Sequence, residues 1–99
     1  MSGKSVTSKT CVDYAETLQA AIKATEALQP EEPGLDNLLA TLRDELAEAK
    51  CGRTRMRQGS YGFHRYVEFD KSSPAISRFE SAVMAAEHFV RRHLVDERH

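Results

Sequence analysis

Hydrophobic residues recur every three or four positions in three stretches of the chain, which is the period of an amphipathic helix. The first stretch covers residues 10–29, and its apolar stripe consists of Cys11, Ala15, Leu18, Ile22, Thr25 and Leu28. The second covers residues 35–50, with a leucine-rich stripe of Leu35, Leu38, Leu39, Leu42, Leu46 and Ala49. The third runs from residue 72 to about 96 and repeats the pattern at Ile76, Phe79, Val83, Ala86, Val90 and Leu94. The spacing therefore predicts three helices.

Residues that start and stop helices flank these stretches. Ser8 or Thr10 is a suitable N-cap for the first helix, because a hydroxyl there accepts from a free backbone N–H. Gly52 follows the second stretch at the position where glycine most often closes a helix. Ser73 and Pro74 are a suitable N-cap and first residue for the third helix. These residues support the three helical spans.

The period changes to two after the second helix, which predicts extended strands. Arginines alternate with other residues over 53–58, and aromatic and β-branched residues alternate with others over 61–69. Gly59 and Ser60 lie between the two runs, as in the turn of a β-hairpin. We therefore predict an α+β, mainly α fold of three helices with one β-hairpin inserted before the last helix, in the order α-α-β-β-α.

The length of 99 residues is sufficient for one modest core. With 40% apolar and 29% charged residues, the composition is that of an ordinary globular protein. We predict a flexible N-terminal tail at residues 1–7 and a single helical domain at residues 8–99, with the hairpin at about 53–69. A lone two-stranded ribbon must be covered by helix or must pair with the hairpin of a second subunit, which is a route to a homodimer.

No stretch approaches the roughly 20 apolar residues of a membrane helix, and the first residues contain no hydrophobic signal segment. The sequence therefore predicts a cytoplasmic protein, and its alanine- and arginine-rich composition favours a bacterial source. Cys11 and Cys51 are expected to be free thiols, because disulfides rarely persist in the cytoplasm.

The net charge of −1 hides a sharp partition of charge along the chain. Residues 13–48 carry nine carboxylates against Lys23 and Arg43, a formal charge of −7, whereas residues 50–67 carry five basic residues and no acidic one. Such a partition indicates either that the two segments pack on each other or that one presents its charge to a partner. A third alternative is that the alternating arginines protect an exposed sheet edge from aggregation.

Few residues suggest metal binding or catalysis. The cysteines and histidines have no typical zinc-ligand spacing; they are Cys11, Cys51, His64, His88, His93 and His99. Nothing places a nucleophile next to a base, or two carboxylates in an apolar cleft. We predict no metal and no cofactor, and we expect that the protein is not an enzyme.

The sequence favours a small protein-interaction module, an accessory regulator or inhibitor that binds another protein through charge-complementary surfaces. The predicted partner-binding residues are Arg53, Arg55, Arg57, Tyr61, Phe63, Arg65 and Tyr66. A second, acidic patch is expected at Asp44, Glu45 and Glu48. The alternative is a nucleic-acid-binding protein, since arginines neutralise phosphates and exposed aromatic rings stack on bases along the same hairpin, residues 50–67.

The third helical stretch suggests a further interface. Met84 and Phe89 lie off its main stripe, so its apolar surface is wider than one packing face needs. This surplus is either core beneath the hairpin or a contact with a second chain, including a homodimer partner.

Overall fold

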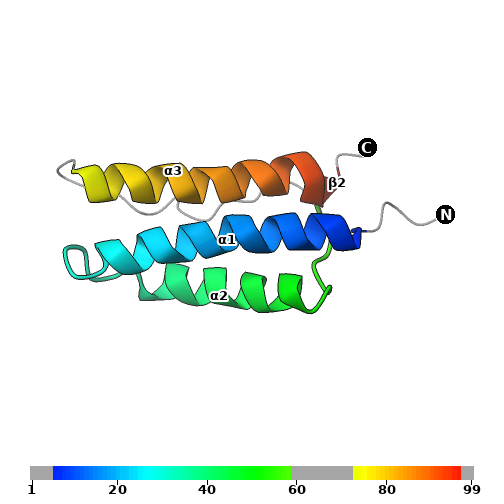
Figure 1. Ribbon diagram of the computed structural model, residues 1–99, viewed down its shortest axis with the longest axis horizontal. Coiled ribbons are helices and arrows are strands. Elements are labelled where there is room, and N and C mark those ends of the chain that lie inside the picture. The colour runs from blue at the N-terminus through cyan, green and yellow to red at the C-terminus, as the bar shows by residue number, and fades with distance from the viewer. Residues whose placement is uncertain (1–5, 59–72, 97–99) are drawn as a thin grey trace.

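The computed structural model describes residues 6–58 and 73–96, and within these ranges the fold is mainly helical (Figure 1). Helix α1 covers Ser8–Leu28, α2 covers Asp36–Lys50 and α3 covers Pro74–Phe89. The last helix continues into a π-helical turn, η1, at Val90–Leu94. The prediction of three helices in a mainly α fold is confirmed. In the described part of the chain, no helix is long and apolar enough to cross a bilayer.

Hydroxyl side chains cap the first residues of α1 and α3. The Thr7 hydroxyl accepts a hydrogen bond from the Thr10 backbone N–H at 3.1 Å, so the cap of α1 lies one residue before the predicted Ser8. The Ser73 hydroxyl caps α3 by accepting from the Ile76 N–H at 3.2 Å, with Pro74 in the first turn as predicted. Each cap satisfies a donor that the helix itself leaves unpaired.

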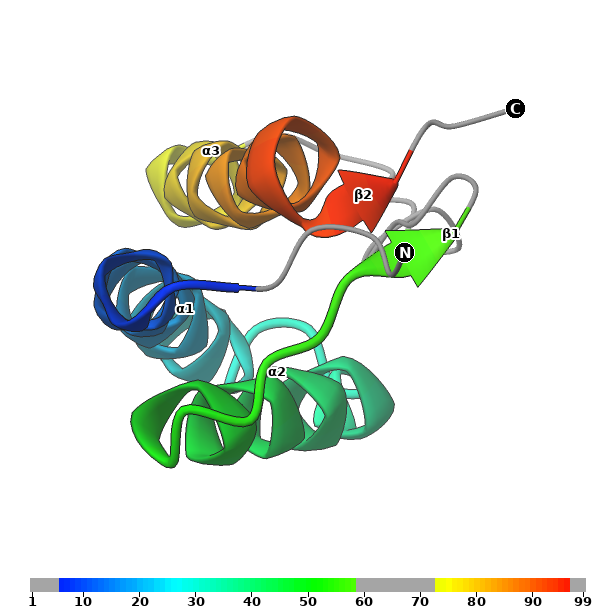
Figure 2. The same cartoon turned by 90° about the vertical axis from the view of Figure 1, so that its right-hand side faces the viewer.

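Helix α1 is the central element. It packs on both α2 and α3, whereas α2 and α3 barely contact each other (Figure 2). Tyr14 and Ala21 are buried together with most of the predicted stripe, because they lie three or four positions from Cys11, Leu18 and Thr25 and so on the same face. The fully buried positions of the core come from all three helices and include Tyr14, Leu18, Leu28, Leu42, Phe79, Val83, Val90 and Leu94.

The predicted β-hairpin is wrong. Strand β1 is only Arg57–Gln58, and it pairs in parallel with β2, Val95–Asp96, at the far end of the chain. A hairpin needs two antiparallel strands joined by a short turn, and this pair has neither feature. The second predicted strand, at 61–69, lies outside the described residues. Pairing of hairpins is therefore no basis for a homodimer, and the homodimer itself stays a prediction.

Candidate partner-binding site

The predicted basic segment begins where α2 ends, in a Schellman motif. The Gly52 N–H donates to the Ala49 carbonyl at 3.1 Å, and the Arg53 N–H donates to the Glu48 carbonyl at 2.8 Å. Gly52 has a φ of +70°, which side chains disfavour and glycine tolerates. This confirms the role predicted for Gly52. The motif turns the chain out of the helix and directs it toward the end of α3.

Residues 53–56 are not helical, and their side chains alternate between solvent and the core. Arg53 and Arg55 are exposed, whereas Thr54 is buried and Met56 is half-buried against the hydrophobic core. The period of two seen in the sequence is thus present, although it comes from a single segment that covers the end of the bundle. Its inward side anchors the segment, and its outward side presents guanidinium groups.

The side chains of the other predicted partner-binding residues are not among those that the structure describes. Arg57 belongs to β1, but its side chain is not among the described ones. Tyr61, Phe63, Arg65 and Tyr66 lie outside the described residues. The structure therefore brings together Arg53 and Arg55 from the predicted set.

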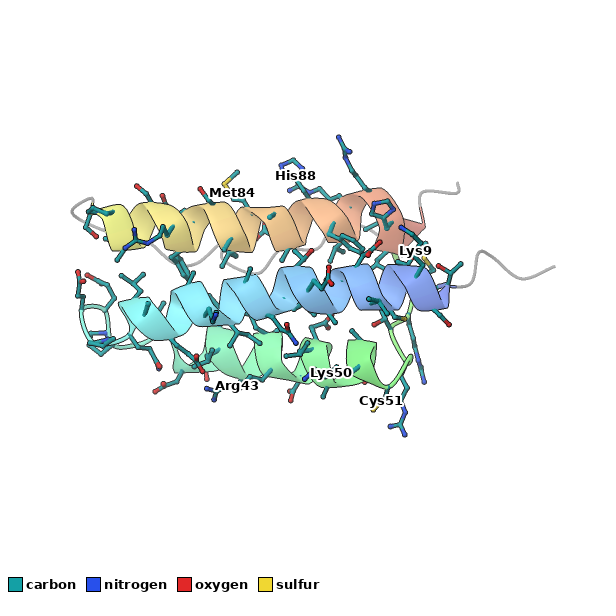
Figure 3. The ribbon with its side chains drawn as sticks, viewed as in Figure 1. Lys9, Arg43, Lys50, Cys51, Met84 and His88 are labelled. Atoms are coloured by element: carbon teal, nitrogen blue, oxygen red, sulfur yellow. The ribbon has the colours of Figure 1, made fainter. Side chains whose placement is uncertain are left out.

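Other basic residues share this end of the bundle with Arg53 and Arg55. Figure 2 looks onto this end, where α1 begins and where α2 and η1 finish. Figure 3 shows Lys9 and Lys50 there, and both are exposed. Exposed Arg91 and Arg92 of η1 complete the group. We use the name basic end for six residues: Lys9, Lys50, Arg53, Arg55, Arg91 and Arg92.

Within residues 6–58 and 73–96, most cations of the basic end lack an acidic partner. Lys9 pairs with Asp13 at 3.2 Å, a contact between two well-exposed side chains on one helix. Among the described residues, no ion pair forms at Lys50 or at any of the four arginines of the basic end. The alternative in which the basic segment docks on the acidic second helix is therefore not seen for Arg53 and Arg55. Sequence reasoning missed Arg91 and Arg92, because they lie between Val90 and Leu94 of an apolar helix stripe and far from Arg53 in the chain.

The predicted acidic patch is divided. Asp44 and Glu48 are exposed on α2, as expected for a solvent-facing side. Glu45 is half-buried and accepts a hydrogen bond from the Tyr14 hydroxyl at 2.7 Å, across the interface between α1 and α2. Glu45 therefore has a structural contact, and only the other two carboxylates face solvent as a surface pair.

A row of rings supports the turn that carries Arg91 and Arg92. The Tyr14 ring stacks on Phe89 with centroids 5.2 Å apart and an angle of 14° between the planes. The Phe89 ring in turn lies against the His93 ring, with the two ring centroids 4.7 Å apart. Phe89 is thus part of the packing between α1 and α3, whereas Met84, on the outer side of α3, is 46% exposed (Figure 3).

The described residues include no group of three His, Cys, Asp or Glu side chains placed to hold a metal ion. Cys11 is buried and Cys51 is exposed, and both are free thiols as predicted. Comparison with protein families, with curated proteins and with solved structures finds no match, so the function is argued from the geometry of this chain.

Proposed function

We propose that this protein is a small, non-enzymatic interaction module of the cytoplasm, which binds an acidic surface of another protein and regulates or inhibits it. The proposal rests on one observation: Arg53 and Arg55 are exposed, lie on the same side of a core-anchored segment and have no acidic partner among the described residues.

The spacing of these arginines suits recognition of carboxylates. Alternate residues of an extended segment lie about 7 Å apart, so Arg53 and Arg55 can each engage a separate group. A guanidinium offers planar, bidentate hydrogen bonds to a carboxylate, which makes arginine a common anchor in interfaces. Burial of Thr54 and of part of Met56 holds the backbone between them, so less conformational entropy is lost on binding than for a free loop.

A protein partner is favoured over nucleic acid by two features. The described aromatic side chains do not form a stacking surface: Tyr14 and Phe79 are buried, and Phe89 is half-buried against Tyr14. A net charge of −1 is also unlike that of a dedicated nucleic-acid binder.

The test is affinity capture of the tagged protein from a lysate of its own source, with and without nuclease. Wild type is compared with the double variant Arg53→Ala/Arg55→Ala. A control variant, Lys23→Ala/Arg78→Ala, removes the same charge from two exposed residues away from the basic end. Melting temperatures of all three proteins should agree within a few degrees, since the four replaced side chains are exposed.

We expect a stoichiometric protein partner that survives nuclease, remains bound to the control and is lost from the arginine variant. If partners are recovered only when nucleic acid is present, the proposal is overturned in favour of the nucleic-acid alternative. Equal capture by the arginine variant would show that this segment is not the binding site.

A further inference from the structure

The short parallel bridge brings together two parts of the chain that carry exposed arginines. Arg57 lies opposite Val95, so the segment that precedes β1 and the turn that precedes β2 meet at one end of the bundle. Figure 2 shows both arriving there, one from α2 and the other from α3. Arg53 and Arg55 lie on the first part, and Arg91 and Arg92 lie on the second.

The second part is a π-helical turn, a rare conformation that occurs frequently at functional sites. Val90 and Leu94 are fully buried at its two ends, whereas the three residues between them are exposed. The ring of His93 lies against Phe89, which is itself stacked on Tyr14. The turn is therefore anchored on both sides of Arg91 and Arg92, which are presented from a fixed base.

The charges of this turn are not neutralised within the described part of the chain. Arg91 and Arg92 form no ion pair there, and neither do Arg53 and Arg55. The negative end of the α3 dipole favours cations near it, but this effect is weak at an exposed site and does not neutralise several guanidiniums. Four arginines from two parts of the chain thus remain available to an anionic partner.

We infer that Arg91 and Arg92 form, with Arg53 and Arg55, one composite surface that binds an acidic polypeptide segment. This inference rests on the proposed function and adds two specificity-determining residues to it. The partner must present carboxylates over a surface wide enough to reach both parts, which a segment rich in Asp or Glu does. A small anion could bind to one pair of arginines alone, so its binding would not show whether the two pairs act as one surface.

The test uses a fluorescein-labelled 20-residue polyglutamate peptide in place of the natural partner. Protein is titrated into the peptide at low salt, and binding is followed by the fluorescence anisotropy of the peptide. Four proteins are compared: wild type, Arg53→Ala/Arg55→Ala, Arg91→Ala/Arg92→Ala and the control Lys23→Ala/Arg78→Ala. All three variants lose the same formal charge. Circular dichroism and thermal melting establish that each is folded.

We expect each arginine pair to weaken binding by about five- to tenfold, as for two exposed ion pairs, and the control to bind within about twofold of wild type. If Arg91→Ala/Arg92→Ala binds like wild type while Arg53→Ala/Arg55→Ala is weakened, the composite surface is refuted and the proposed function stands. If Arg53→Ala/Arg55→Ala is not weakened, the proposed site fails, and the composite surface fails with it. If a 20-nucleotide single-stranded DNA displaces the peptide at a concentration at least tenfold below that of unlabelled polyglutamate, the assignment to an acidic polypeptide is overturned.

Discussion

Replacing Thr54 with valine should stabilise the protein. Thr54 is 7% exposed, and its buried hydroxyl oxygen has no hydrogen-bond partner in the part of the chain that the structure describes. A buried hydroxyl that leaves water without a partner carries a desolvation cost, which valine removes while keeping nearly the same shape. Valine also suits an extended backbone. The substitution therefore removes a penalty without breaking an interaction.

The size of the effect follows from the desolvation cost. An unsatisfied buried polar group costs about 1–3 kcal/mol, and part of this is recovered because a methyl group of similar volume is buried instead. We expect Thr54→Val to raise the free energy of unfolding by about 1 kcal/mol. For a domain of this size, that corresponds to a rise of roughly 4–8 °C in the melting temperature.

Thr25→Val is the matched control. Thr25 is fully buried in α1, and its hydroxyl donates to the Ala21 carbonyl at 2.7 Å. The same chemical change therefore breaks a hydrogen bond there, and we expect a loss of about 0.5–1.5 kcal/mol. Urea unfolding at constant m-value measures both variants. Equal destabilisation of the two would show that the Thr54 hydroxyl has a partner after all, and would refute the reasoning.

Two further predictions concern the end of α2. Gly52→Ala should lower the free energy of unfolding by roughly 1 kcal/mol, as measured by urea unfolding. The φ of +70° disfavours a residue with a Cβ, even though no neighbouring atom would contact that Cβ. An unchanged urea midpoint would contradict this prediction. Exposed Cys51 should react with a thiol reagent at once, whereas buried Cys11 should react only as the protein unfolds. Rapid reaction of two thiols per native protein molecule would contradict that assignment.

The helices could be predicted because their determinants are local. The apolar period, the serine cap of α3 and the closing glycine of α2 all act within a few residues. The buried face of α1 was predicted incompletely. Tyr14 is missing from the stripe read from the sequence, although it lies three positions after Cys11 and four before Leu18 and so shares their face.

The candidate site was predicted in part for a similar reason. Alternation in 53–56 correctly indicated side chains on opposite sides, but the same pattern suggested a hairpin, because a period of two does not reveal which strand is the partner. The observed partner of β1, Val95–Asp96, is almost forty positions away. Arg91 and Arg92 joined the basic end through that distant contact, which no local pattern encodes.

The central position of α1 has a consequence for the order of assembly. Helices α1 and α2 are joined by the short connection at 29–35, so they can form a helical hairpin early, at a small cost in loop-closure entropy. Packing of α3 on α1 joins residues separated by at least forty-five positions and is slower for that reason. The basic end needs both the segment after α2 and the turn after α3. It is therefore assembled only when α3 has docked, so a half-folded chain would not present the complete surface to a partner.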